Sequence, residues 1–557
     1  MCGFAGALHV DPLRPRADLQ RAARCIARRG PDSLKRWISP DGTVDIVHAR
    51  LAIVDQGGLA HQPMTDPDTG TTVAFNGEIY NYPELRSDLA RYPYRTDSDT
   101  EVILAAYRTW GIDAVARFRG MFAMVLVDGQ TGAVYLVRDP VGKKPLFVAE
   151  WAGSFVFGSS VLALAAAIGG GRPIDPTAAS EYWTDGHVGP TRSLFSGCRP
   201  VLPGEIVELS RCRASRSFRV TPAPAEASGA ESDRQRLSAL LERSVSERLR
   251  DNPNPVALIS GGIDSTVVTA ALRRVTMPQT LTLGALVPLT HDERYARYAA
   301  RRLRLPLTVV SPSIERIEDE ADFCFDLQDE PLGMMSFLPL ALLLKAVKPH
   351  GRILFTGDGG DEVFLGYGQP ADWVGAAPIE NEPQVPCGPA IPAWMSPWGR
   401  RTVTHALVGH MFTKLDRASA EQGIEVRCPL LDWNLMAFAR SLLPETLLAA
   451  NRPKHLLKAQ LAGWPSWYLN RKKVGFAYNL RWAWALRRFA GLRDRVDVDA
   501  QAVFHRVLPE TLRRPALQWT MLDIWRHFPQ VWKLLAWSAF QRRTREIGRA
   551  IIEEATA

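Results

Sequence analysis

The sequence lacks any apolar run that approaches the ~20 residues needed for a membrane-spanning helix. Its start also lacks a basic segment followed by an apolar stretch and a cleavage site, so we expect a cytoplasmic protein that is neither secreted nor membrane-bound. The seven cysteines are odd in number, scattered, and never arranged as a CxxC pair. That pattern disfavours both a disulfide framework and a structural zinc site.

A strong excess of charge of one sign is also absent. The 67 Lys and Arg residues outweigh the 59 Asp and Glu residues only slightly, for a net charge of +8, and the arginines are dispersed. We therefore predict a basic, solvated surface and no nucleic-acid partner. At 557 residues the chain is longer than one hydrophobic core usually organises, which predicts two large domains.

Short β-type runs separated by turn signals fill the first part of the chain, with helical patterns between them. The runs cover residues 44–47, 72–75, 122–128, 133–138 and 154–157, and the helical patterns cover 18–28 and 101–110. This alternation predicts layered sheets with flanking helices.

Cys2 stands directly after the initiator methionine. Removal of Met1 would leave Cys2 with both a thiol and a free α-amine, and such an amine titrates at roughly 7.7 to 8.0, near working pH. One residue would then supply the nucleophile and the base for acyl transfer. A lone free cysteine is more often a buried small hydrophobe, so this interpretation depends on the downstream motifs.

Four polar clusters interrupt the elements of this region. They are Arg-Arg-Gly-Pro-Asp at 28–32, His-Ala-Arg-Leu-Ala-Ile-Val-Asp at 48–55, Phe-Asn-Gly-Glu-Ile-Tyr-Asn at 75–81 and Ser-Asp-Thr-Glu at 98–101. Taken singly, Asn76-Gly77 predicts an ordinary hairpin turn, and the fourth cluster predicts a helix cap.

In this order after an N-terminal Cys-Gly, the clusters resemble class II glutamine amidotransferases, whose N-terminal domain hydrolyses glutamine to glutamate and ammonia. The match covers about residues 2–165 and includes the run at 137–146. The resemblance implies an Ntn-type αββα sandwich in which Cys2 attacks the glutamine amide. It also implies Asn76 and the Gly77 amide as oxyanion donors, which are worth several kcal/mol at a developing charge.

The same resemblance assigns the substrate contacts. Arg50 falls where the family holds the glutamine α-carboxylate, a role that suits a planar bidentate fork. Glu78 and Asp99 fall where the family binds the substrate ammonium. Ser160 stands where relatives usually have glutamate, so contacts between the domains are expected to differ.

A composition rich in Ala, Pro, Ser and Glu between residues 222 and 232 does not build a core. We place a linker at 211–232, between an amidotransferase domain at 2–210 and a second domain at 233–557. A helical pattern at 233–248 leads into the apolar run 256–259, which suits a buried parallel strand.

A Ser-Gly-Gly-Ile-Asp-Ser loop at 260–265 follows that strand and precedes a helical pattern. Backbone amides, glycines and a helix N-terminus make an anion cradle there, although a generic glycine-rich loop is often only a turn. The loop resembles the pyrophosphate loop of ATP pyrophosphatases and lacks the GxxxxGK[ST] spacing. The implied ATP contacts are Leu258, Ser260, Gly261, Gly262, Asp264, Ser265, Thr356 and Gly357.

A second parallel-strand pattern at 353–355 runs into an acidic loop at 356–364. Carboxylates beside phosphate loops usually hold Mg²⁺. By resemblance Asp264 and Asp361 are the magnesium ligands, and Asp358 matches a catalytic acidic position that is commonly glutamate. Without the resemblance, Asp358 reads as a turn former.

Further motifs at 329–331, 413–417, 425–432, 452–454 and 471–476 complete a resemblance to asparagine synthetases that runs from residue 2 to about 480. It implies a doubly wound parallel-sheet synthetase domain with extra helices, the cofactors ATP and Mg²⁺, L-aspartate as acceptor, and a homodimer by analogy. Lys473 aligns with the lysine that neutralises charge as pyrophosphate leaves. Alone it would read as a solvated surface lysine.

The acceptor is the least determined part. Gly368-Gln369-Pro370 replaces the basic and aromatic residues common in asparagine synthetases, and 369–400 is rich in Pro and Trp. The alternative is therefore an asparagine synthetase-like amidotransferase that amidates another carboxylate in a specialised pathway. Three other classes fit less well. Cys2, Arg50 and Asp99 are all present, which disfavours a β-lactam or lasso-type cyclase and a non-catalytic homologue. No RNA-binding module is visible, which disfavours a tRNA-modifying PP-loop enzyme. Residues 481–557 are expected to be packing helices.

Overall fold

The structure is a computed structural model of residues 1–557. It describes all of them except 56, 171, 211–215, 220–231, 251–253, 285–291, 312, 314, 376–386, 449–451, 472–479, 481–483, 486–490 and 557, and for 216 and 549–556 it describes only the backbone. Lys473 and most of the predicted linker lie outside the described residues.

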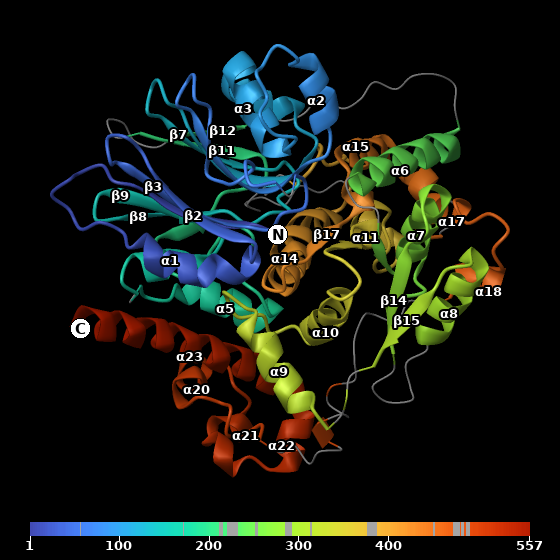
Figure 1. Cartoon of the computed structure of the whole chain (residues 1–557). Coiled ribbons are helices and arrows are strands. Elements are labelled where there is room, and N and C mark those ends of the chain that lie inside the picture. Colours follow the sequence, from blue (N-terminus) through green and yellow to red (C-terminus); the bar gives the residue numbers. More distant parts are fainter. Residues whose placement is uncertain are drawn as a thin grey trace.

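Two antiparallel six-stranded sheets form the first domain (Figure 1). The first has the order β10 (Cys198–Pro200), β8 (Phe147–Trp151), β9 (Ser154–Gly158), β1 (Gly3–Leu8), β3 (Val44–Arg50) and β2 (Ser33–Ile38). The second has the order β12 (Arg216–Arg219), β11 (Glu205–Leu209), β7 (Val134–Arg138), β6 (Gly120–Val127), β5 (Thr72–Ile79) and β4 (Met64–Thr65).

Strand β6 shows why these sheets stack with helices outside them. Phe122 and Met124 face one hydrophobic cluster, while Ala123 and Val125 face another, because successive side chains of a strand point to opposite faces. The first cluster joins the second sheet to α2 (Tyr82–Asp88) and α3 (Asp99–Trp110), and the other fills the space between the sheets. Helices α1 (Leu19–Ile26) and α4 (Val161–Ala167) cover the first sheet, so the expected αββα layering is confirmed.

The predicted hairpin turn at Asn76-Gly77 is wrong. Both residues lie inside β5, where Gly77 pairs with Phe122 of β6. Gly77 has φ +153°, and a Cβ on it would lie 2.0 Å from the carbonyl oxygen of Met121. Glycine is required here because the neighbouring strand approaches so closely. A local Asn-Gly signal cannot reveal that approach. The predicted cap at Ser98 is confirmed, since its Oγ accepts from Thr100 N at 3.1 Å.

The described part of the range predicted as linker contains one element. Strand β12, at 216–219, pairs antiparallel with β11 and extends the second sheet at its edge. Backbone pairing with an open sheet edge needs no apolar signature, which explains why the composition did not indicate it.

The second domain is built on a wholly parallel sheet of five strands. Their order is β15 (Leu307–Val310), β14 (Gln279–Leu283), β13 (Val256–Leu258), β16 (Ile353–Phe355) and β17 (Glu425–Arg427). The chain runs outward from β13 in one direction and then returns to β16 on its other side. This is the doubly wound topology that the sequence implied, and its order reverses between β13 and β16.

Helices cover both faces of this sheet (Figure 1). One face carries α6 (Asp233–Leu249), α7 (Ile263–Val275) and α8 (Asp292–Leu303), and the other carries α10 (Phe337–Val347) and α14 (Thr413–Ala420). Shorter helices include α5 (Pro176–Asp185), α11 (Gly360–Val363), α12 (Pro370–Trp373), α13 (Pro397–Arg401), α15 (Trp433–Ser441), α16 (Pro444–Leu447), α17 (His455–Ala459) and α18 (Ser466–Leu469), with a π-helix at Thr402–Phe412.

The C-terminal segment consists of packing helices, as expected: α20 (Val498–Phe504), α21 (Glu510–Arg513), α22 (Met521–Arg526) and the long α23 (Phe528–Thr556). Helix α23 contacts α4 of the first domain and α9 (Ile317–Asp326) of the second. The Tyr182 hydroxyl of α5 donates to the Lys533 carbonyl at 2.6 Å. Among the helices that the structure describes, none has the length and apolarity to cross a membrane.

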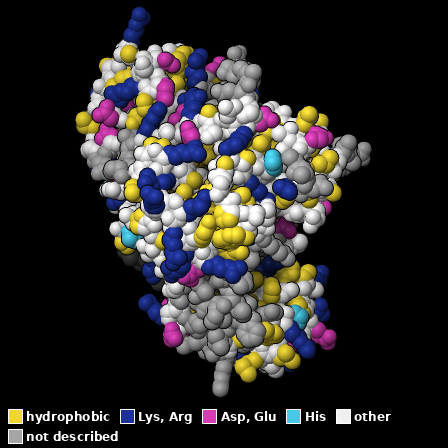
Figure 2. All heavy atoms as spheres, turned by 90° about the vertical axis from the view of Figure 1, so that its right-hand side faces the viewer, with side chains coloured by type: hydrophobic (Ala, Val, Ile, Leu, Met, Phe, Trp, Pro, Cys, Tyr) yellow, Lys and Arg dark blue, Asp and Glu magenta, His cyan; other side chains and the backbone are white. Residues whose placement is uncertain are grey.

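Charged side chains are spread over the surface. Figure 2 shows one face, on which Lys and Arg side chains are distributed with Asp and Glu among them rather than gathered in one stripe. The face is consistent with the dispersed arginines of the sequence.

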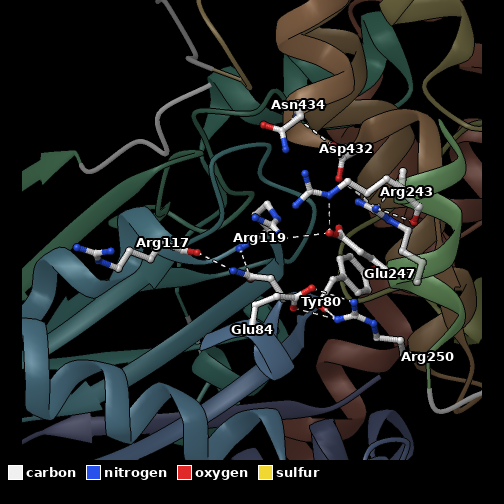
Figure 3. Close-up of polar contacts among 12 residues, drawn as sticks. Tyr80, Glu84, Arg117, Arg119, Arg243, Glu247, Arg250, Asp432 and Asn434 are labelled. Carbon is white, nitrogen blue, oxygen red and sulfur yellow. Dashed lines mark hydrogen bonds and ion pairs between the residues drawn. The ribbon is translucent and has the colours of Figure 1, made fainter. Parts of the chain in front are cut away.

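Ion pairs between the two domains differ in how far they are buried. Arg29 pairs with Asp416 at 2.9 Å, and both side chains are buried. Nearer the surface, Arg250 at the end of α6 pairs with Glu84 at 2.9 Å (Figure 3).

The N-terminus of α4 also draws on both domains. Ser160 accepts from Ala163 N at 3.3 Å, and Asp329 of the second domain accepts from Val161 N at 3.2 Å. A carboxylate therefore lies at this helix N-terminus although residue 160 is serine. That interdomain contacts differ from those of relatives stays a prediction.

Candidate active sites

Cys2 lies in a cavity at the boundary of the two domains. It directly precedes β1, is 9% exposed, and its Sγ accepts a hydrogen bond from Leu51 N at 3.3 Å. The cavity is lined by Cys2, Arg50, Leu51, Ile53, Val54, Gln62, Phe75, Gly77, Glu78, Ser98, Asp99, Thr100 and Glu425. The structure thus brings together five predicted glutaminase residues that are separated by up to 97 positions in the chain.

The surroundings of Cys2 disfavour charge. Met1 is present and buried, so the Cys2 nitrogen is a peptide nitrogen here. Burial lowers the pKa of the Met1 ammonium to about 5 and raises the pKa of the Cys2 thiol. Burial therefore favours the neutral form of both the Met1 amine and the Cys2 thiol.

Gly77 lines the same cavity, and Asn76 directly precedes it in β5. Asn76 is fully buried, and neither atom of its side-chain amide has a hydrogen-bond partner among the described residues. Buried polar groups are nearly always paired, so an orphaned amide calls for an explanation. One explanation is that the Asn76 amide is a donor for the oxygen of a reacting amide.

Arg50 carries an unneutralised charge into the cavity. Its Nη2 donates to the carbonyl oxygens of Val54 at 3.2 Å and Asp55 at 2.5 Å. No carboxylate of the described chain pairs with it. These carbonyls fix the guanidinium in place and leave its charge for a ligand anion.

Asp99 and Glu78 occupy different surroundings. The Asp99 Oδ2 accepts from Ile79 N at 3.0 Å, and burial raises the pKa of the Asp99 carboxyl to about 6. Glu78 instead pairs with Arg427 of the second domain at 2.7 Å. Both line the cavity, but Asp99 alone lacks an ion-pair partner in the part of the chain that the structure describes.

Sequence reasoning missed the contribution of β17. Arg427 is fully buried and donates to Glu78 and Glu425, each at 2.7 Å. Burial raises the pKa of the Glu78 carboxyl, the Arg427 guanidinium lowers it, and the nearby Glu425 carboxylate raises it again. The motif at 425–432 was recognised, but nothing in its spacing indicated that Glu425 would line the cavity of Cys2.

The raised pKa of the Asp99 carboxyl predicts a pH dependence of glutamine hydrolysis. As pH falls through about 6 its carboxylate takes up a proton, and it can then no longer pair with a substrate ammonium. We expect kcat/KM for glutamine to fall about tenfold for each unit below that pKa. Asp99→Asn should raise KM at pH 7.5 and flatten this limb.

The matched control is Asp97→Asn, two residues away, where the Asp97 side chain is 91% exposed. An acid limb that persists unchanged in Asp99→Asn would assign the titration to another group.

The second candidate site lies where the parallel sheet reverses its order. The loop 260–265 follows β13, and the loop 356–361 follows β16, the neighbouring strand. A Cβ on Gly357 would lie 2.4 Å from Ser265 N, and one on Gly360 would lie 2.3 Å from Asp264 Cγ. The two loops are therefore in direct contact, in the crevice where open α/β sheets bind ligands.

The loop after β13 presents backbone donors. Gly262 is the N-cap of α7 and supplies no side chain to its free amides. Ser265 Oγ donates to the Gly262 carbonyl at 3.1 Å, and Ser260 N donates to Ser265 Oγ at 3.2 Å. This shape, with Gly261 at φ +73°, suits a phosphate group.

The remaining predicted residues lie around these loops. Leu258 ends β13, and Thr356 follows β16, where Thr356 N donates to the Arg427 carbonyl at 3.0 Å. Asp358 lies in the turn before α11. Lys473 lies outside the described residues, so its position stays a prediction.

Asp264 and Asp361 lie on either side of a third residue, Lys454, and their role as magnesium ligands stays a prediction. Lys454 forms ion pairs with both carboxylates, at 2.5 Å to Asp361. Two carboxylates at a phosphate loop fit Mg²⁺, which completes its shell with waters and phosphate oxygens. Within the described ranges no cluster of three or more metal-ligating side chains occurs.

Two family models match the chain. A glutamine amidotransferase domain matches residues 1–218, and asparagine synthase matches residues 236–386 and 392–542. The gap between the two matches overlaps the predicted linker at 211–232.

Curated relatives and solved structures are also similar to this chain. Asparagine synthetase [glutamine-hydrolyzing] 1 of Bacillus subtilis (strain 168) is 30% identical over 69% of this chain, which spans 61% of the relative's length. Asparagine synthetase B of Escherichia coli (strain K12) is 27% identical over 87% of this chain and 83% of its own. The structure of a B. subtilis glutamine phosphoribosylpyrophosphate amidotransferase aligns over 64% of this chain and 81% of its own, with 12% identity and a TM-score of 0.31. The chain belongs to the glutamine-hydrolysing asparagine synthetase family and has its two-domain architecture, an amidotransferase domain followed by an asparagine synthase domain.

Proposed function

We propose that the chain is a glutamine-dependent asparagine synthetase that makes L-asparagine, AMP, pyrophosphate and glutamate from L-aspartate, ATP and glutamine. One observation carries the proposal. Strand β17 is three residues long, and its first residue, Glu425, lines the cavity of Cys2. Its last residue, Arg427, bonds through its carbonyl to Thr356 of the nucleotide loop. A single short strand therefore joins the two sites.

Glutamine hydrolysis uses the first site, after removal of Met1. The Cys2 thiol gives its proton to the adjacent α-amine, and the sulfur attacks the amide carbon of glutamine. The carbon–nitrogen bond then breaks, the amine returns the proton to the leaving nitrogen as ammonia, and a glutamyl thioester remains. Water adds to the thioester and releases glutamate and the thiol.

The described residues suit this step. Asn76 and the Gly77 amide would stabilise the oxyanion of each tetrahedral intermediate, a contribution of several kcal/mol. Arg50 would hold the substrate α-carboxylate, and Asp99 its ammonium. Glu78 would act with Asp99 through its negative charge while it stays paired with Arg427.

Adenylation uses the second site. The aspartate side-chain carboxylate attacks the α-phosphorus of ATP, pyrophosphate leaves, and an acyl-adenylate forms. The amides of the loop 260–265 and the N-terminus of α7 would hold the phosphates. Bound Mg²⁺ at Asp264 and Asp361 would supply neutralising charge.

Amide formation joins the two reactions. Ammonia from the first site attacks the acyl carbon, AMP leaves, and one proton is lost to give the amide. Ammonia released into bulk water would protonate and diffuse away, so we propose passage through the interior along β17. Asp358, on the turn beside the metal carboxylates, is the proposed acceptor of the proton.

Pyrophosphate release with ATP, Mg²⁺ and glutamine, measured across a panel of carboxylic acids with mass spectrometry of the products, tests the function. We expect release with L-aspartate and formation of asparagine. No pyrophosphate release with aspartate, together with intact glutaminase activity, would contradict aspartate as the acceptor. It would indicate that the segment 369–400 shapes the pocket for another carboxylate.

Lys473→Ala provides a second test. We expect glutaminase activity to survive and pyrophosphate release to fall by about 100-fold, because the leaving group would lose a neutralising charge. Both activities are measured on the same sample, so glutaminase serves as the folding control. Normal pyrophosphate output would remove Lys473 from the site.

A further inference from the structure

Lys454 occupies the centre of the proposed metal site. Its Nζ lies between Asp264 of the α7 loop and Asp361 of α11, and its side chain is only 9% exposed. The motif at 452–454 matched the family without a role for this lysine. The geometry shows it to be a cation held between the same two carboxylates that the sequence assigned to magnesium.

The local backbone is arranged for this contact. Lys454 is the N-cap of α17 in a left-handed conformation, φ 59°, and its N donates to the Phe364 carbonyl at 3.2 Å. Gly366 leaves room for the pair, since a Cβ there would lie 2.2 Å from Lys454 Cε and 2.0 Å from Asp361 Oδ1. An unfavourable backbone conformation and a required glycine thus both serve the placement of one ammonium.

Charge explains what the ammonium does there. Two carboxylates held close together repel each other, and a buried pair of like charges is costly without a counter-ion. The lysine supplies that counter-ion within the chain. A divalent cation that binds between the same carboxylates must take the place of the ammonium.

We propose that Lys454 is a tethered counter-ion of the metal site, which a divalent cation displaces when it arrives with nucleotide, and which then contacts the nucleotide phosphates. The inference rests on the proposed ATP site. The lysine opposes binding of metal alone and favours binding of metal together with phosphate. Removal of Lys454 should therefore change the two affinities in opposite directions.

The experiment measures binding of Mn²⁺ alone to the full-length protein by electron paramagnetic resonance, and binding of Mg-ATP by equilibrium dialysis. Lys454→Met should bind Mn²⁺ about tenfold more tightly and Mg-ATP about tenfold more weakly than the unaltered protein. Lys454→Asn should behave alike, and because asparagine tolerates the left-handed conformation it keeps the test valid if the methionine variant misfolds. A merely structural role would weaken both affinities.

Lys458→Met is the matched control, because Lys458 lies one turn along the same helix and makes no ion pair with either carboxylate in the described structure. It should leave both affinities unchanged. Mn²⁺ affinity that is unchanged or reduced in both Lys454 variants would overturn the inference. If the unaltered protein binds Mn²⁺ but no Mg-ATP, the proposed function fails instead, and the Mn²⁺ comparison still decides the role of the lysine as a counter-ion.

Discussion

Replacing Cys2 with alanine is expected to abolish amide synthesis from glutamine while sparing synthesis from ammonium salts. The substitution removes the sulfur that attacks the substrate, and loss of a catalytic nucleophile lowers rates by factors on the order of 10⁵ to 10⁶. Ammonia from solvent does not need this atom. The nucleotide loops lie on the parallel sheet of the other domain, so their chemistry should continue.

Glutamate release and amide formation, each measured with glutamine and with ammonium chloride, check this expectation. Cys25→Ala is the matched control, since Cys25 is a free, partly buried cysteine of α1 outside the cavity. Loss of both activities in Cys2→Ala, with an unaltered melting temperature, would contradict the separation of the two sites.

Local pattern was sufficient for much of the nucleotide site. The strand predicted at 353–355 is β16 without change of bounds. The segment 260–265 joins β13 to α7 in the expected order, but α7 begins at Ile263, three residues earlier than predicted. An apolar run that ends in glycine and acidic residues predicts a strand followed by a phosphate-binding loop from about ten consecutive residues. This is possible because the backbone itself forms the phosphate cradle. Hence the pairing of Asp264 with the second loop could be inferred from sequence.

Local pattern failed where a neighbouring strand decides the conformation. Asn76-Gly77 has the composition of a tight turn, but its glycine is required by the carbonyl of Met121 on β6. The turn signal predicted the wrong structure for this pair, and the oxyanion role that the family motif implies for it stays a prediction. The constraint comes from a strand more than forty residues away, which no short window contains.

Charge pairs between residues far apart in the chain were equally inaccessible. Arg427 and Glu78, which lie in different domains, are separated by 349 positions, and Lys454 and Asp264, both in the second domain, by 190. No periodicity links such residues, because the pairing depends on the tertiary fold and, for Arg427 and Glu78, on how the two domains meet. The only hint in the sequence was that Arg427 and Lys454 stand inside recognised motifs. The structure shows both side chains to be buried, and a buried cation requires a partner.

Arg427→Met is expected to cause the largest loss of stability. The guanidinium is fully buried and pairs with Glu78 and Glu425, whose side chains are 5% and 4% exposed. Its removal would leave two carboxylates facing each other without a counter-ion. Breaking a buried ion pair by deleting one partner costs about 3 to 5 kcal/mol.

Arg250→Met is the matched control at the same domain boundary. Arg250 pairs with Glu84 at 2.9 Å, but the two side chains are 36% and 47% exposed. Exposed pairs contribute about 0 to 1 kcal/mol because water screens them. Both variants lose one interdomain arginine, so the difference between them isolates the effect of burial.

Chemical denaturation with separate readouts for each domain measures the effect. The triple variant Arg427→Met, Glu78→Gln and Glu425→Gln should recover much of the lost stability, because it removes the unpaired charges together with the arginine. It should not recover glutaminase activity if Glu78 takes part in binding the substrate ammonium. Equal, small stability losses in Arg427→Met and Arg250→Met would show that water reaches the Glu78–Arg427–Glu425 cluster, and that β17 does not hold the two sites together through buried charge.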